Sequence, residues 1–122
     1  MTADESVRAF FAAFSRRDVD AAVALVCEDM ELWPEGTAER AGRTEPYRGE
    51  EGIRRYFADV EAGWDELVVE PGELRVAGDG VVVFGNVRGR AGDIVLEVPV
   101  IWVFKLRDGR LHRGRVVTTA TR

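Results

Sequence analysis

His112 is the side chain of this sequence best suited to acid–base chemistry, and it is the only histidine. An unperturbed imidazole has a pKa near ~6.5, so it can accept or donate a proton at neutral pH. No carboxylate stands where the sequence would place it to orient the ring. His112 is therefore either an acid–base catalyst or an ordinary, partly exposed histidine on a strand beside a hairpin.

Asn86 and Arg88 are the other polar side chains that could act on a ligand. They lie two residues apart in a run that predicts a strand, so both point to the same face of a sheet. They either bind a polar group of a ligand or simply reach the rim of the sheet. Tyr56 and Tyr47 could each donate a hydrogen bond into a cavity.

Motifs for metal, nucleotide or covalent chemistry are absent from the sequence. Cys27 is the only cysteine, which excludes an intramolecular disulfide and a thiolate metal cluster. There is no phosphate loop, nucleotide fingerprint or nucleophile–base–acid trio. We therefore expect neither a metal nor a cofactor, and we expect Cys27 to be a small buried side chain.

Length and composition describe one ordinary globular domain that spans residues 1–122. The chain is 46% hydrophobic and 32% charged, a balance typical of folded proteins. The net charge of -5 argues against a nucleic-acid partner, because a phosphate backbone requires a basic face. The acidic start of the chain has no signal-sequence pattern, and no 18-residue apolar run follows. We expect a cytoplasmic protein without membrane contact.

Three helices are predicted in the first half of the chain. Thr2 and Glu5 form a capping box before a stripe of three phenylalanines, Phe10, Phe11 and Phe14. Asp18 is a suitable N-cap for a short second helix. A third helix begins near Gly49 and buries a stripe that runs to Trp64. Between the second and third helices, residues 29–34 predict a short strand and residues 35–48 a loop.

The second half of the chain predicts four strands joined by three hairpins. The strands cover residues 66–77, 81–90, 94–107 and 110–119, and turn residues such as Asp108-Gly109 separate them. A Pro71-Gly72 pair indicates a bulge in the first of these strands. Consecutive hairpins form an antiparallel sheet, and helices gathered at the N-terminal side make the fold class α+β.

The strand over residues 94–107 is apolar on both sides. One set is Val98, Val100, Trp102, Phe104 and Leu106, and the other is Pro99, Ile101 and Val103. The helices can cover only one face of the sheet, and an antiparallel sheet normally leaves its other face polar. We therefore expect a homodimer through Pro99, Ile101 and Val103. About 800 Å² per subunit would suffice.

The order of these elements resembles the SnoaL-like (polyketide cyclase-like) branch of the nuclear transport factor 2-like superfamily. The resemblance rests on "RRDVDAAVALVCEDMELW", "YRGEEGIRRYF" and "VFKLRDGRLHRGRV", and it covers essentially the whole chain. It implies a cone-shaped, curved antiparallel sheet wrapped around the three helices, with an apolar cavity inside. It also implies dimers through the outer sheet face.

Catalytic groups of enzymes in that superfamily are not matched. The resemblance puts Pro34, Phe10 and Trp102 where ketosteroid isomerase has its base and its two oxyanion-stabilising groups. Scytalone dehydratase needs more than one histidine, and the Asp-Arg-Asp trio of limonene epoxide hydrolase has no convincing counterpart. Whether the chain is an enzyme is left open by the sequence.

The resemblance also implies which side chains face the cavity. Trp102, Phe104 and Val100 point inward on the long strand, and His112, Gly114 and Val116 point inward on the last strand. Gly114 enlarges the cavity locally. On residues 81–90 either Phe84, Asn86 and Arg88 or Val83 and Val87 face inward, and we favour the first set. The predicted ligand-binding residues are Tyr56, Trp64, Phe84, Asn86, Arg88, Trp102, Phe104, Gly114 and Val116.

Three functions fit this pattern. The first is binding of a small, largely apolar molecule in the aromatic cavity, because ligand pockets are mostly apolar with few polar groups. The second is an acid–base isomerase, cyclase or hydratase that uses His112. The third is a non-catalytic dimerisation or interaction module whose core is filled by its own aromatic rings.

Overall fold

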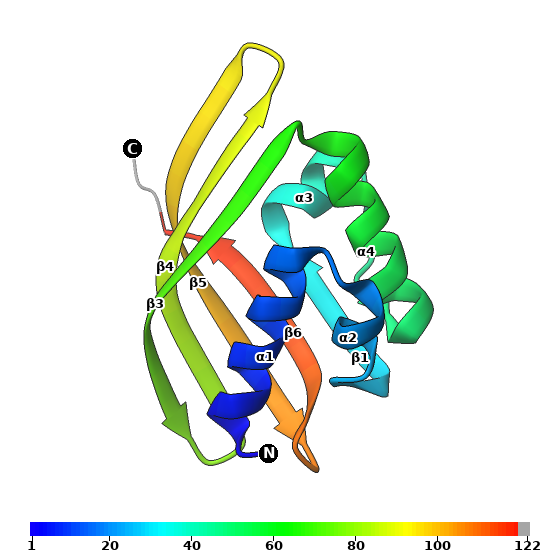
Figure 1. The fold of residues 1–122 in the computed structure, drawn as a ribbon, viewed down its shortest axis with the longest axis vertical. Coiled ribbons are helices and arrows are strands. Elements are labelled where there is room, and N and C mark those ends of the chain that lie inside the picture. Colours follow the sequence, from blue (N-terminus) through cyan, green and yellow to red (C-terminus); the bar gives the residue numbers. More distant parts are fainter. Residues whose placement is uncertain (120–122) are drawn as a thin grey trace.

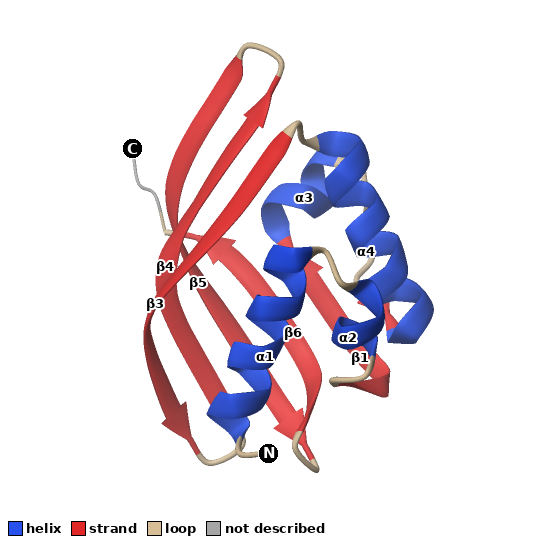
Figure 2. Ribbon diagram, viewed as in Figure 1, coloured by secondary structure: helices blue, strands red, loops and turns tan. Residues whose placement is uncertain are grey.

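The computed structural model describes residues 1–119. Four helices and six strands follow one another along the chain, and all four helices lie on one side of a single curved sheet (Figures 1 and 2). The elements are α1 (Ala3–Arg16), α2 (Val19–Val23), β1 (Val26–Pro34), α3 (Glu35–Arg40), β2 (Tyr47–Arg48), α4 (Gly49–Gly63), β3 (Glu66–Ala77), β4 (Gly80–Ala91), β5 (Ile94–Arg107) and β6 (Arg110–Thr118). The α+β class is confirmed.

The helix starts follow the capping chemistry of the sequence. Thr2 and Glu5 form the predicted capping box at α1, and the Asp18 side chain accepts a hydrogen bond from the backbone N–H of Ala21 at α2. These caps satisfy donors that the first helical turn leaves unpaired. No helix in residues 1–119 is both long enough and apolar enough to cross a membrane.

The strand order is β2-β1-β6-β5-β4-β3. The three hairpins from β3 to β6 are antiparallel, as predicted, and the pairing of β3 with β4 shifts between Pro71 and Leu74, at the predicted bulge. The sheet was expected to be antiparallel, but β1 pairs with β6 in parallel, so the sheet is mixed. Most of the chain separates these two strands, so no tight hairpin forces them to be antiparallel.

The segment between β1 and α4 also differs from the prediction. Residues 35–48 were expected to form a loop, but they contain the short helix α3 and the two-residue strand β2. A six-residue helix is too short to show a 3.6-residue apolar period. Its only buried residues are Thr37 and Ala38. The first strand also begins earlier than predicted, at Val26, and so Cys27 is a buried strand residue.

The helices pack on the inner face of the sheet, and the sheet curves around α1 (Figure 1). The Phe10 ring lies edge-on to Phe104 at 6.2 Å between centroids, and Phe11 lies edge-on to Trp102 at 5.0 Å. The phenylalanine stripe of α1 therefore packs against the inward set of β5. This packing fills most of the space between α1 and the sheet. The larger space lies between α3, the end of α4 and the sheet.

Candidate functional site

An apolar cavity of about 160 Å³ lies between α3, the end of α4 and the inner face of the sheet. Most of its walls are aliphatic or aromatic, and Val87, Leu96 and Val98 come from the β4–β5 hairpin, which extends beyond the helices in Figure 1. Within residues 1–119, no Asp, Glu, Lys, Arg or His lines it. The side chains that line it include Pro34, Thr37, Tyr56, Trp64, Leu67, Val69, Val87, Leu96, Val98, Val100, Trp102, Val116 and Thr118.

Trp64 forms one wall of the cavity, as predicted. It is the C-cap of α4, and its indole N–H donates to the Thr37 hydroxyl over 3.3 Å, which joins α3 to α4. The Arg40 guanidinium stacks over the indole at 4.8 Å from the ring centroid. Both contacts fix the ring orientation, so the wall is held in place before any ligand arrives.

Trp102 and Phe104 both point inward, as predicted, but only Trp102 lines the cavity. Phe104 lies deeper, around a residual void of only about 20 Å³ that three α1 phenylalanines surround. Gly114 also faces inward, yet it does not enlarge the cavity as expected. A Cβ built on Gly114 would lie 2.9 Å from Leu32 Cδ1 and 3.1 Å from the Phe104 ring, so those side chains already fill the space.

Tyr56 is a lining residue of the cavity that carries a hydroxyl. The residue is buried, lines both the cavity and the deeper void, and stacks on Phe14 with 5.5 Å between centroids. Burial raises the pKa of this hydroxyl, the charge of Arg17 opposes the rise, and no hydrogen bond within the described chain takes part. A neutral phenol without a protein partner can donate one hydrogen bond to a molecule in the cavity.

The inward face of β4 is opposite to the one we favoured. Val83 is fully buried and Val87 lines the cavity, whereas Phe84, Asn86 and Arg88 lie on the outer face. Arg88 pairs there with Glu70 at 3.3 Å and Glu97 at 3.8 Å.

Two glycines explain this register of β4. A Cβ on Gly85 would lie 2.9 Å from the Trp102 ring, and a Cβ on Gly89 would lie 2.7 Å from the Trp64 ring. The Trp102 and Trp64 rings therefore lie over β4 at glycines, where no side chain is in the way. Because residues 85, 87 and 89 share one face, the glycines place Val87 inside and Asn86 and Arg88 outside.

His112 does not point into the cavity, contrary to the prediction. The pairing of β5 with β6 shifts so that Leu106 faces Leu111 and Lys105 faces Arg113, which makes His112 an extra residue in β6. Leu111 takes the inward place. The His112 side chain is 18% exposed, with its Nε2 3.4 Å from Asp29 Oδ2 and 3.2 Å from an Arg107 nitrogen. The geometry gives no support to acid–base catalysis in the cavity by His112.

Some cavity residues were not predicted. Leu96 and Val98 share the inward phase of Trp102 on β5, so the alternation itself could have identified them. Val87 belonged to the alternative inward set of β4, which the flanking glycines could have favoured. Thr37 gave no usable signal, because its helix was interpreted as a loop.

Comparison with known proteins agrees with this architecture. A family model described as a SnoaL-like domain matches residues 7–114. The chain belongs to the SnoaL-like domain family. The predicted membership of this branch of the nuclear transport factor 2-like superfamily is thereby confirmed. No curated protein matches the chain at the sequence level.

Solved structures place the SnoaL-like chain among nuclear transport factor 2-like folds. TerC, co-crystallised with polyporic acid, superposes with a TM-score of 0.84 at 24% identity, over 95% of this chain and 90% of TerC. A Burkholderia pseudomallei protein of unknown function gives 0.86 at 21% identity, over 97% and 92%. A putative polyketide cyclase from Sinorhizobium meliloti gives 0.76 at 24% identity, over 96% and 100%. Identities this low establish a shared fold.

Proposed function

We propose that the SnoaL-like chain binds a small, uncharged, largely apolar molecule in the cavity between α3, α4 and the sheet. The supporting observation is the cavity itself: about 160 Å³ of space walled by two tryptophans and a set of valines and leucines. Its polar groups are hydroxyls, chiefly those of Tyr56 and Thr37. An apolar space with few polar groups is the usual composition of a small-molecule site.

The cavity volume limits the ligand to about one ring. An apolar protein cavity of about 150 Å³ accommodates benzene. A tetracyclic polyketide or a steroid therefore exceeds the space unless the lining side chains move. The co-crystallisation of TerC with polyporic acid supports the use of this fold for holding a small molecule.

A hydrogen-bond acceptor on the ligand would meet the Tyr56 hydroxyl. No hydrogen bond contributes to the raised pKa of that hydroxyl, so it can donate one to an acceptor on the ligand. A charged ligand would find no counter-charge among the lining residues and would be desolvated without compensation. The proposed ligand is thus a neutral molecule with one acceptor, such as a small aromatic ketone.

The test is an NMR titration with acetophenone and with ethylbenzene, which keeps the ring and the two-carbon side chain but has no carbonyl. Both should shift amides around the cavity, and Val98→Phe, which fills the cavity, should weaken binding more than tenfold. Val95→Phe is the matched control on the same strand, because Val95 is 74% exposed. Tyr56→Phe should weaken acetophenone binding about two- to tenfold and leave ethylbenzene unchanged, as expected for one hydrogen bond. Binding that is insensitive to Val98→Phe would refute the proposal.

We also propose that two copies pair through the outer sheet face at Pro99, Ile101 and Val103. These three side chains point outward, and Val103 is 43% exposed. The β4 register supports the pairing further, because it adds the Phe84 ring, 38% exposed and directly opposite Ile101. An exposed apolar patch of this kind is a common site of association.

We also propose that the protein is located in the cytoplasm. Cys27 is a buried free thiol, which is compatible with a reducing compartment. Fractionation of the native cell with an antibody against the chain would test it, and recovery outside the cytoplasm would contradict it.

A further inference from the structure

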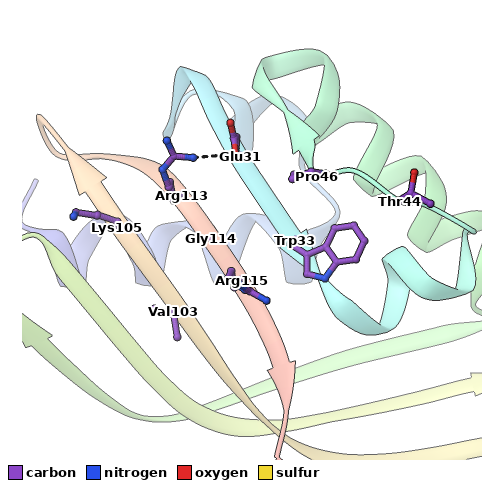
Figure 3. A pocket seen from close by; sticks show the side chains of 9 residues that line it. All are labelled: Glu31, Trp33, Thr44, Pro46, Val103, Lys105, Arg113, Gly114 and Arg115. Carbon is purple, nitrogen blue, oxygen red and sulfur yellow. Dashed lines mark ion pairs between the residues drawn. The ribbon is translucent and has the colours of Figure 1, made fainter.

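A second hollow lies on the opposite face of the sheet from the cavity. It is a groove of about 470 Å³ over β1, β6 and β5, closed on one side by the segment between α3 and β2 (Figure 3). This volume is within the range of sites that hold small molecules. The groove is lined by Glu31, Trp33, Thr44, Pro46, Val103, Lys105, Arg113, Gly114 and Arg115.

The groove is positively charged although the whole chain carries a net charge of -5. Lys105 and Arg113 are direct cross-strand neighbours, and Arg115 lies two residues further along β6. Like charges at such positions repel one another. Glu31 offsets this only in part: it pairs with Arg113 at 2.9 Å (Figure 3) and also with Arg48 at 3.6 Å.

Lys105 and Arg115 are the cations that remain available. Within residues 1–119, neither has a carboxylate oxygen within 4.0 Å, whereas Arg113, Arg48 and Arg88 all do. The two cations lie on neighbouring strands of the same face, but in Figure 3 their side chains point in different directions, and Arg115 is the one directed towards Trp33. An ionised carboxylate is the natural partner, because it accepts charge-assisted hydrogen bonds from ammonium and guanidinium groups.

Trp33 provides an apolar surface next to these charges. It is directly opposite Arg115 in the pairing of β1 with β6, and it is only partly buried. In Figure 3 its indole lies on the side towards which Arg115 points. Pro46 and Val103 add further apolar lining. Together they offer a flat ring a stacking surface next to Arg115.

We propose that this groove is a second binding site, specific for a planar aromatic carboxylate. The carboxylate binds Arg115, the charge of Lys105 adds to the positive potential, and the ring packs against Trp33 and Val103. The site differs from the cavity in its charge preference, since the cavity has no charged lining residue. It adjoins the proposed dimer surface at Val103 and at Arg115, the direct cross-strand neighbour of Val103.

The test is a calorimetric and NMR titration with 2-naphthoate, with the uncharged 2-naphthamide as the comparison ligand. We expect saturable 2-naphthoate binding that weakens with added salt, with amide shifts in β6 and near Trp33. Arg115→Gln should raise the Kd about five- to tenfold, the loss of one charge-assisted contact. Lys105→Gln should raise it by a smaller factor, because Lys105 acts on the carboxylate only through its charge. Arg110→Gln, an exposed cation outside the groove, should leave the Kd unchanged. Trp33→Leu should weaken the binding of 2-naphthoate without changing how that binding depends on salt.

Three results would overturn the proposal. The first is equal affinity of the native protein, Arg115→Gln and Arg110→Gln for 2-naphthoate. The second is a set of amide shifts confined to cavity residues such as Val98 and Trp64. The third is no saturable binding at all, the result expected if a second copy of the chain occupies the groove.

Discussion

Gly85 and Gly89 set the shape of the cavity as much as its aromatic residues do. Each lies directly under an indole ring, and a methyl group at either position would lie within 3 Å of that ring. Trp102 and Trp64 can therefore approach the sheet closely while the space between them stays open. The cavity exists because the inner face of the sheet combines bulky tryptophans with glycines that have no side chain.

Gly89→Ala should destabilise the protein by about 1–3 kcal/mol, the usual range for overpacking a fitted core. The added methyl group would push Trp64 away and weaken its hydrogen bond to Thr37. Urea denaturation measures the stability change, and acetophenone titration shows whether the cavity is altered. Gly36→Ala is the control, because a Cβ there has no neighbour within 4 Å. Equal stability of the two variants would contradict this account.

Asp29 should make stability depend on pH at the acid end. The hydrogen bond from Arg107 lowers the pKa of Asp29 from an ordinary 3.8 to about 2. The folded state therefore keeps the carboxylate charged when the unfolded state has already taken up a proton. The resulting stabilisation is complete above about pH 4 and is lost as the pH falls towards 2.

The measurement compares Asp29→Asn with the native protein in urea between pH 7 and pH 2. The variant should be less stable at neutral pH, and the difference should shrink between pH 4 and pH 2. Asp93→Asn, in the exposed β4–β5 turn, is the control. A difference that stays constant over this range would show that Arg107 does not act through the charge of Asp29.

At the scale of elements, Arg17 joins the end of α1 to the sheet. Its guanidinium donates to the backbone carbonyls of Phe14 and Leu67, the latter over 2.7 Å, and it stacks over the Phe14 ring at 4.3 Å. Its backbone is left-handed, with φ of 57°, a conformation that favours glycine. The side chain thus offsets an unfavourable backbone at the helix end.

Arg17→Ala should destabilise the protein by about 1–3 kcal/mol, because two charge-assisted hydrogen bonds are lost and the left-handed backbone stays. Arg17→Gly should be less harmful by about 0.5–1 kcal/mol, since glycine tolerates the positive φ. Thermal and urea unfolding measure both. Arg16→Ala is the control, because Arg16 has only an exposed pair with Asp18. Equal losses for Arg17→Ala and Arg16→Ala would exclude the proposed role.

Elements whose apolar pattern repeats over many residues were predictable, and short elements were not. The α1 stripe and the three hairpins repeat their patterns over many residues, so local chemistry identifies them. The helix α3 has only one and a half turns, and strand β2 has two residues. Both form because neighbouring elements bury Thr37, Ala38 and Tyr47, which the local sequence does not encode.

At the scale of the whole molecule, the sheet has two dissimilar faces. The inner face carries the helices and a neutral cavity, and the outer face carries an apolar centre around Ile101 with a positively charged groove beside it. The proposed neutral ligand would use the inner face, whereas the proposed second copy and aromatic carboxylate would use adjoining parts of the outer face.

Ile101→Arg should convert the proposed dimer into single copies, because the introduced charges of the two copies would be buried in the same interface. Sedimentation equilibrium measures the mass over a range of concentrations. Val95→Arg, on the same strand but at the exposed hairpin tip, should leave the assembly intact. A native protein that sediments as a single copy at all concentrations would refute the proposed pairing.

The sequence alone determined the helix caps, the hairpin order, the α+β class and the division of β5 into two apolar sets, because each follows from turn chemistry or from a period of 2 or 3.6 residues. Only the tertiary structure decided the inner face of β4 and the place of His112. A single extra residue in β6 moves a side chain from one face to another. The cavity was likewise decided by packing, since its volume is what remains after distant rings from α1, α4 and β5 meet.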